Sequence, residues 1–103
     1  MTARFALTTG ALLALVAVAL GAFGAHALKG RLEPDMATVW QTAAQYHGWH
    51  ALALVAAGLL LLHRPDAVAI AAAAWLFAAG VVLFSGSLYL LALTGVRGLG
   101  AVT

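Results

Sequence analysis

The chain has 103 residues, of which 65% are hydrophobic and 8% are charged, with a formal net charge of +2. A soluble domain is about half apolar and a quarter charged, and a chain of this size cannot hide so much apolar surface from water. The composition therefore predicts an integral membrane protein. The absence of cysteine excludes disulfides and thiolate metal sites, and the scattered Lys and Arg residues do not form the clustered basic face that nucleic-acid binding needs.

Residues 5–28 form the first uncharged run, between Arg4 and Lys29. The run exceeds the roughly 20 residues that a helix needs to cross the hydrocarbon. The alternative is a secretory signal peptide with Ala25-His26-Ala27 as its cleavage site, but signal cores are about 7–15 residues long. The length therefore favours a retained transmembrane helix over residues 5–28.

Small residues recur along this first helix at alternating steps of four and three, which places them on one narrow stripe. Gly destabilises a helix relative to Ala, and lipid gives no reason to prefer it over Leu. The stripe therefore predicts a helix-packing face where a second backbone approaches closely. Alanine is abundant in this chain, so the alternative is a chance pattern. The face consists of Gly10, Ala14, Ala17, Gly21 and Gly24.

The segment 29–35 is rich in charges and includes Pro34, so it is expected in water or among headgroups. Apolar positions at helical spacing from Met36 onward predict an amphipathic interfacial helix over about residues 34–44, with Trp40 at headgroup depth. The alternative is a solvated lead-in that continues directly into the next span.

The second transmembrane helix is predicted over about residues 45–63. Tyr46 and Trp49 in its first turns are typical of the membrane interface. His47 and His50 fall on the same helix face and are expected to look toward a neighbouring helix.

The third span, about residues 67–94, is longer than the hydrocarbon core requires. It must tilt, protrude, or break near Ser85-Gly86-Ser87. A second small-residue ridge, including Gly80, Gly86 and Ser87, is expected to meet the first one. Residues 95–100 are interpreted as a flexible exit.

The only constellation that suggests chemistry is His26 with His50. His26 ends the first helix and His50 lies near the start of the second, so neighbouring antiparallel helices are expected to bring them face to face. One interpretation is a hydrogen-bonded pair that fixes the helix register. The other is cofactor binding, with the two imidazoles as ligands of a haem or partners of a quinone or proton. No metal site and no catalytic residues are predicted.

The chain resembles the YgdD-like family of small inner-membrane proteins through three motifs in order, which are GAFGAHAL, YHGWHALAL, and SGSLYLLALTG followed by LGAVT. This is a domain-of-unknown-function family (number four-two-three) with an animal mitochondrial relative. The resemblance covers nearly the whole chain and implies a small helical membrane protein without established activity. His26, His50, Gly21 and Gly24 stand at the family's motif positions, as do Ser87, Tyr89 and Gly95, whereas His47 departs from the usual residue. Family members usually continue into a fourth hydrophobic helix, which this sequence lacks. The expectation is therefore a shortened chain, and the alternative is a three-helix version of the family.

The sequence thus predicts one all-α domain over residues 1–103, a multi-pass protein of the bacterial inner membrane with three transmembrane helices and an interfacial helix. The charge distribution leans toward an N-terminus outside. The expected role is that of a non-enzymatic accessory or structural subunit without a cofactor. Its expected partners are lipids and either further copies of itself or other membrane subunits. The alternative is a haem-, quinone- or proton-handling protein that uses His26 and His50.

Overall fold

The computed structural model describes all 103 residues and is built only of helices. Three helical paths are long and apolar enough to cross a membrane, over Ala3–His26, Pro34–His63 and Val68–Thr94. The predicted three-helix membrane fold is confirmed. In chain order the elements are α1 (Ala3–His26), α2 (Pro34–His63), α3 (Val68–Gly80), the π-helical segment η1 (Val81–Ser85), α4 (Gly86–Thr94) and the 3-10 helix η2 (Arg97–Val102).

Local sequence explains where the helices begin and turn. The Thr2 side chain caps α1 by accepting a hydrogen bond of 3.1 Å from the backbone N–H of Phe5. Pro34 opens α2, where its missing N–H is no loss because the first turn of a helix has no internal acceptor for it. Gly30 and Gly95 adopt positive φ angles of 76° and 70° and turn the chain after α1 and α4.

The interfacial helix predicted over residues 34–44 is not a separate element. Residues Pro34–His63 form one uninterrupted α-helix, so the continuous lead-in, the alternative interpretation, is what the structure shows. No proline lies between Pro34 and Pro65 to interrupt the backbone hydrogen bonds of the helix. The first three turns of α2 also pack against α1, which a helix lying flat at the interface would not do.

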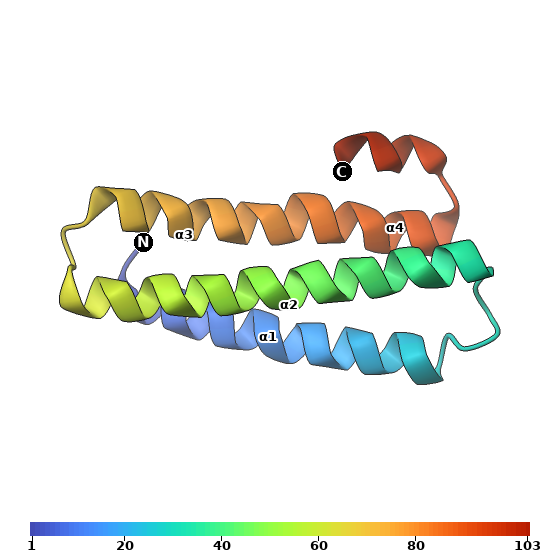
Figure 1. Ribbon diagram of the computed structural model, residues 1–103, viewed down its shortest axis with the longest axis horizontal. Helices are drawn as coiled ribbons and strands as arrows, with labels where there is room; N and C mark the ends of the chain where they lie inside the picture. Colours follow the sequence, from blue (N-terminus) through green and yellow to red (C-terminus); the bar gives the residue numbers. More distant parts are fainter.

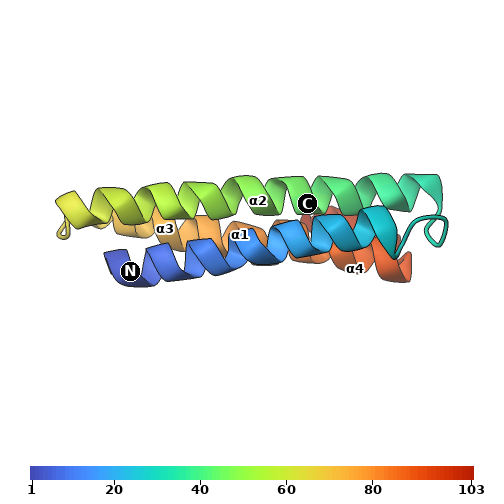
Figure 2. The same cartoon turned by 90° about the horizontal axis from the view of Figure 1, so that it is seen from below.

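The three spans run antiparallel with α2 in the middle (Figure 1). Turning the molecule by 90° shows α1 along one side of α2 and the α3–α4 path along the other (Figure 2). The Cα atoms extend 47 × 27 × 13 Å, so the molecule is a slab and not a closed bundle. Both outer helices therefore keep much of their surface for lipid or for other proteins.

The third span changes its winding next to the Ser85-Gly86-Ser87 motif, where a break is one of three outcomes expected from the length of the span. Val81–Ser85 is a π-helical turn, and the helix then continues as α4. Single π turns inside α-helices are uncommon and often accompany functional sites. The span thus stays helical across the Ser-Gly-Ser motif, with a wider turn directly before it.

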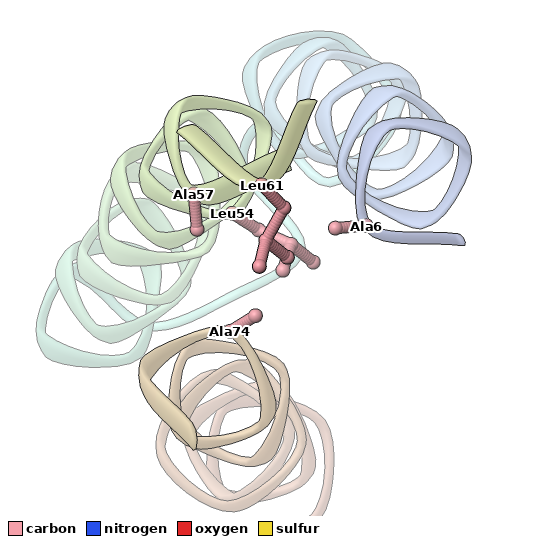
Figure 3. Packing of buried hydrophobic residues seen from close by; sticks show 5 residues of the cluster. All are labelled: Ala6, Leu54, Ala57, Leu61 and Ala74. Carbon is pink, nitrogen blue, oxygen red and sulfur yellow. The ribbon is translucent and has the colours of Figure 1, made fainter. Parts of the chain in front are cut away.

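A small apolar core ties the three helices together at the end where the chain begins. Leu54 and Leu61 of α2 are completely buried and point between Ala6 of α1 and Ala74 of α3 (Figure 3). Ala57 completes this cluster. Its only large buried residues come from α2, opposite alanines of α1 and α3, and the partly buried Leu13, Ile70 and Phe77 pack against it.

The C-terminal segment is ordered and is not the flexible exit that the sequence predicts. After Gly95 the chain folds back along α4 as η2 (Figure 1). Leu99 packs against a buried cluster that includes Met36 and Leu91. This apolar contact explains why a glycine-containing tail takes a fixed path.

Candidate functional site

The small-residue stripe of α1 lies against α2. An added Cβ at Gly10 would come within 2.7 Å of Val55 Cγ2 and 3.1 Å of the Ala51 carbonyl oxygen. At Gly21 the nearest atom would be Ala44 Cβ, at 4.0 Å. Gly58 of α2 makes a similar close contact with α1, because a Cβ added there would lie 2.8 Å from Leu7 Cγ. The stripe thus contacts α2 closely at Gly10, whereas Ala14 and Ala17 also line an open groove of about 320 Å³ between α1 and α2.

Trp40 is turned inward and is 4% exposed, although the sequence analysis places it among the headgroups. Its indole Nε1 donates a hydrogen bond of 2.8 Å to the Leu20 carbonyl of α1. The ring occupies the space that a side chain at Gly24 would need. Tyr46 and Trp49, the other two predicted interfacial residues, are exposed and pack edge to face with centroids 4.8 Å apart.

The second ridge faces α2 and does not meet the first ridge. A Cβ at Gly80 would lie 3.1 Å from Cδ2 of the His50 ring. Ser87 is buried and donates a 2.8 Å hydrogen bond to the Phe84 carbonyl of its own helix, whereas Gly86 has only its own helix's Val81 carbonyl near its Cβ position. The two ridges stay apart because α2 lies between α1 and the third span.

The structure does not bring His26 and His50 together. The Cβ that Gly48 lacks would lie 3.9 Å from Ala17 Cβ, which fixes the register of α1 against α2. Counting from this contact at 1.5 Å per residue, the two histidines lie about 17 Å apart along the bundle. His26 is exposed at the end of α1, while Nδ1 of His50 lies 2.7 Å from the Tyr46 carbonyl of its own helix. The expected face-to-face pair fails because α2 begins well before the membrane span.

The histidine that the structure singles out is His47. It is 3% exposed, and its Nδ1 lies 3.0 Å from the Tyr89 hydroxyl of α4. The Tyr89 ring also packs on Trp40, with ring centroids 4.8 Å apart, and the centroid of Phe23 of α1 lies 6.1 Å from that of Trp40. One connected group of aromatic and polar side chains therefore joins all three spans.

Two polar atoms in this region are buried without a hydrogen-bond partner, His47 Nε2 and Ser85 Oγ. If the Tyr89 hydroxyl donates to Nδ1, only the Nε2–H of the imidazole lacks a partner. In the other tautomer, both Nε2 and the tyrosine hydroxyl proton lack one. The first arrangement leaves fewer unmet groups and is the more stable. The site thus presents an N–H donor and a serine hydroxyl inside the membrane slab.

From the sequence alone no role is assigned to His47, because it departs from the family's usual residue, and Ser85 is named only as part of the Ser85-Gly86-Ser87 motif. A signal was nevertheless present, because an ionisable residue inside an apolar span is a functional suspect by default. What the sequence did not reveal was the partner, since Tyr89 is 42 positions away.

A second feature of interest is an apolar groove between α2 and α3 that opens to the outside. Its volume is about 350 Å³, and all eight lining residues are hydrophobic. Five of them are alanines, whose small side chains would let another helix backbone approach closely. The lining consists of Ala53, Ala56, Ala57, Leu60, Ala69, Ile70, Ala73 and Phe77.

The structure is that of a small multi-pass helical membrane protein. It has three apolar spans, an outer surface rich in exposed leucine and valine, and charges confined to the loops and helix ends. Residues 20–103 match the model of a family described as "Protein of unknown function (DUF423)". The chain belongs to this family, so the resemblance seen in the sequence is confirmed.

The chain is also similar to proteins named UPF0382 membrane protein. It is 48% identical to YwdK of Bacillus subtilis over 94 residues, which is 91% of this chain and 76% of that protein. It is 47% identical to SERP0230 of Staphylococcus epidermidis, over 91% of this chain and 75% of the relative. No solved structure matches the chain significantly.

Proposed function

We propose that this protein is a non-enzymatic accessory subunit of the bacterial inner (cell) membrane that docks a transmembrane helix into the α2–α3 groove. The observation that carries the proposal is the alanine lining of this groove. Transmembrane helices associate where small residues let backbones approach, because apolar side chains gain nothing by leaving lipid for protein. The location follows from the helical spans, since outer-membrane spans are β-barrels.

The proposed occupant is α3 of a second copy. Of the 13 residues of α3, only Ala74 is buried within the chain. Its outer surface carries further small residues, including Ala72 and Ala79, which are exposed. A two-fold arrangement would place each α3 against the groove of the other copy and cover both surfaces at once. The groove between α1 and α2 is lined by only three alanines and includes the polar Gln45, so the wholly apolar α2–α3 groove with its five alanines is the better docking surface.

Cysteine cross-linking tests this arrangement directly, because the chain has no cysteine of its own. An Ala56→Cys variant places a thiol in the groove, and Ala11→Cys places one on the exposed surface of α1. Because the second copy's α3 would lie between the two groove thiols, native membranes are treated with a bifunctional maleimide that reaches across one helix diameter, about 10–12 Å. A cross-linked dimer is expected with the first variant and none with the second. A cross-link from Ala56→Cys to a different protein would keep the accessory role and replace the occupant.

Native mass spectrometry in mild detergent gives the second measurement. Ala56→Leu is expected to reduce the oligomer several-fold by filling the groove, whereas Ala11→Leu, which adds the same side chain at an exposed position of α1, is expected to leave it unchanged. A monodisperse monomer without any partner at native expression would rule out the proposed role. The haem, quinone or proton alternative built on His26 and His50 has no geometric support, because those residues lie on different levels of the bundle.

A further inference from the structure

The layer of the molecule around His47 contains more polar groups than its hydrogen bonds use. Nε2 of His47 and Oγ of Ser85 are both buried without a partner, in residues that are 3% and 1% exposed. In lipid no outside solvent can compensate such groups, so each one carries a free-energy penalty unless something inside the protein binds it. Two such groups need an explanation that the apolar packing does not give.

Neighbouring contacts place these two residues on the same level. On one side of His47, Ala43 of α2 belongs to a buried cluster with Leu88 of α4. On the other side, His50 packs against Gly80. His47 lies between Ala43 and His50, and Ser85 lies between Gly80 and Leu88, so both occupy the same stretch of this interface.

Both residues also sit on the inner faces of their helices. His47 continues the buried stripe of α2 that includes Ala43, Ala51 and Leu54. Ser85 continues the buried stripe of the third span that includes Val81, Leu88 and Ala92. Both side chains therefore lie within the interior of the slab and not toward lipid.

The π-helical turn ends at Ser85, so the unusual backbone and the unpartnered hydroxyl coincide. Counting 1.5 Å per residue from the end of α4 at Thr94, Ser85 lies about 14 Å inside the helix. This depth is within the hydrocarbon, far from the headgroups. The Leu13 carbonyl of α1 also lies beside the His47 ring and offers a further acceptor.

We propose that His47 Nε2 and Ser85 Oγ bind a water molecule between them, in the middle of the membrane span. The Nε2–H donates to the water oxygen, and the water donates to Ser85 Oγ. Buried waters typically make about three hydrogen bonds to polar groups that would otherwise be unsatisfied. The second proton of the water can be donated to the Leu13 carbonyl, which lies beside the His47 ring. The ligand is thus water, held by side chains from α2 and η1, and the site is independent of the groove that serves the proposed function.

Magic-angle-spinning NMR of the full chain in lipid bilayers tests the site. With ¹⁵N-labelled histidine, magnetisation transfer from water to the Nε2–H of His47 is expected in the wild type. Ser85→Ala is expected to reduce this transfer at least about threefold, because the water loses its second anchor. Ser85→Thr keeps the hydroxyl and is expected to retain the transfer.

Ser87→Ala is the matched control, since the Ser87 hydroxyl already bonds its own helix and is expected to leave the transfer unchanged. Backbone spectra of each variant show whether the fold is kept, and the Ser85→Thr result decides the question if Ser85→Ala does not fold. The proposal would be overturned if the His47 Nε2–H of the wild type received no magnetisation from water, for example because it bonds directly to the Leu13 carbonyl. Transfer that survives in Ser85→Ala would overturn it as well.

Discussion

The two sides of α2 are packed by different means. On the α1 side, glycines bring the backbones together, as at Gly10 against Val55 and Ala51. On the side of the third span, larger residues and polar groups meet, the helix changes its winding at Val81–Ser85, and an open groove remains. The α1 side thus combines close backbone contacts with a groove of about 320 Å³, whereas the side of the third span adds buried polar groups without a hydrogen-bond partner.

The two sides of α2 are expected to differ in whether a substitution changes stability or binding. A glycine seam in lipid derives its strength from close van der Waals contact, so an added methyl group destabilises it wherever the backbones already touch, as at Gly10. The opposite side has an unfilled groove and two unpartnered polar atoms, which a purely structural interface has no reason to keep. We therefore expect substitutions on the α1 side to change the free energy of unfolding and those on the α3–α4 side to change binding.

The largest effect is expected for Gly24→Ala. The new methyl group would collide with the Trp40 ring, which must move and lose its hydrogen bond to the Leu20 carbonyl. Overpacking and the lost bond together predict a loss of about 2–3 kcal/mol in the free energy of unfolding. Titration with SDS in mixed micelles, followed by tryptophan fluorescence, measures it.

Gly21→Ala is the control for this experiment, because its methyl group would meet only Ala44 Cβ at 4.0 Å. It is expected to be neutral or slightly stabilising, since Ala is a better helix former than Gly. Equal losses in the free energy of unfolding of the two variants would mean that the loss arises within helix α1 itself and not from its contact with Trp40.

A somewhat smaller loss is expected for Gly10→Ala. Here the methyl group would lie 3.0 Å from the Val55 nitrogen, a backbone atom that cannot turn aside. Overpacking less the gain in helix propensity predicts a loss of about 1–2 kcal/mol, measured by the same titration. Gly48→Ala, with its nearest neighbour at 3.9 Å, should unfold like the wild type. If Gly10→Ala also did so, the seam would be looser than described.

Tyr89→Phe tests the polar contact on the other side of α2. It removes the hydroxyl that lies 3.0 Å from His47 Nδ1 and keeps the ring that packs on Trp40. A hydrogen bond between transmembrane helices contributes about 0.6 kcal/mol on average, so the expected loss is of that size. Tyr46→Phe is the matched control, because its hydroxyl makes no hydrogen bond within the chain. A loss above about 2 kcal/mol for Tyr89→Phe would mean that stability resides on both sides of α2.

The smallest effect on stability is expected for Ala56→Leu in the groove. The position is exposed in the single chain, and such substitutions change the free energy of unfolding by less than about 0.5 kcal/mol. SDS titration of the monomer at high dilution measures this value. The same variant is expected to weaken self-association, so a stability loss comparable to that of Gly10→Ala would place the groove inside the folded core.

The sequence by itself determined the class of protein, the three spans and the family. These follow from long runs of apolar residues bounded by charges, and lipid imposes helical structure on such runs because their backbone polar groups must be satisfied internally. The glycine spacing in α1 also indicated a close packing face, because that pattern is local to one helix.

Only the tertiary structure decided which faces meet. The register of α1 against α2 separates His26 from His50 and turns Trp40 inward, and it depends on contacts between residues far apart in the chain. The pairing of His47 with Tyr89, and the level that His47 shares with Ser85, depend on the antiparallel return of the third span and on its π turn. Helix periodicity shows the direction of a side chain around its own axis, whereas the depth and identity of its neighbour are fixed only when the helices pack.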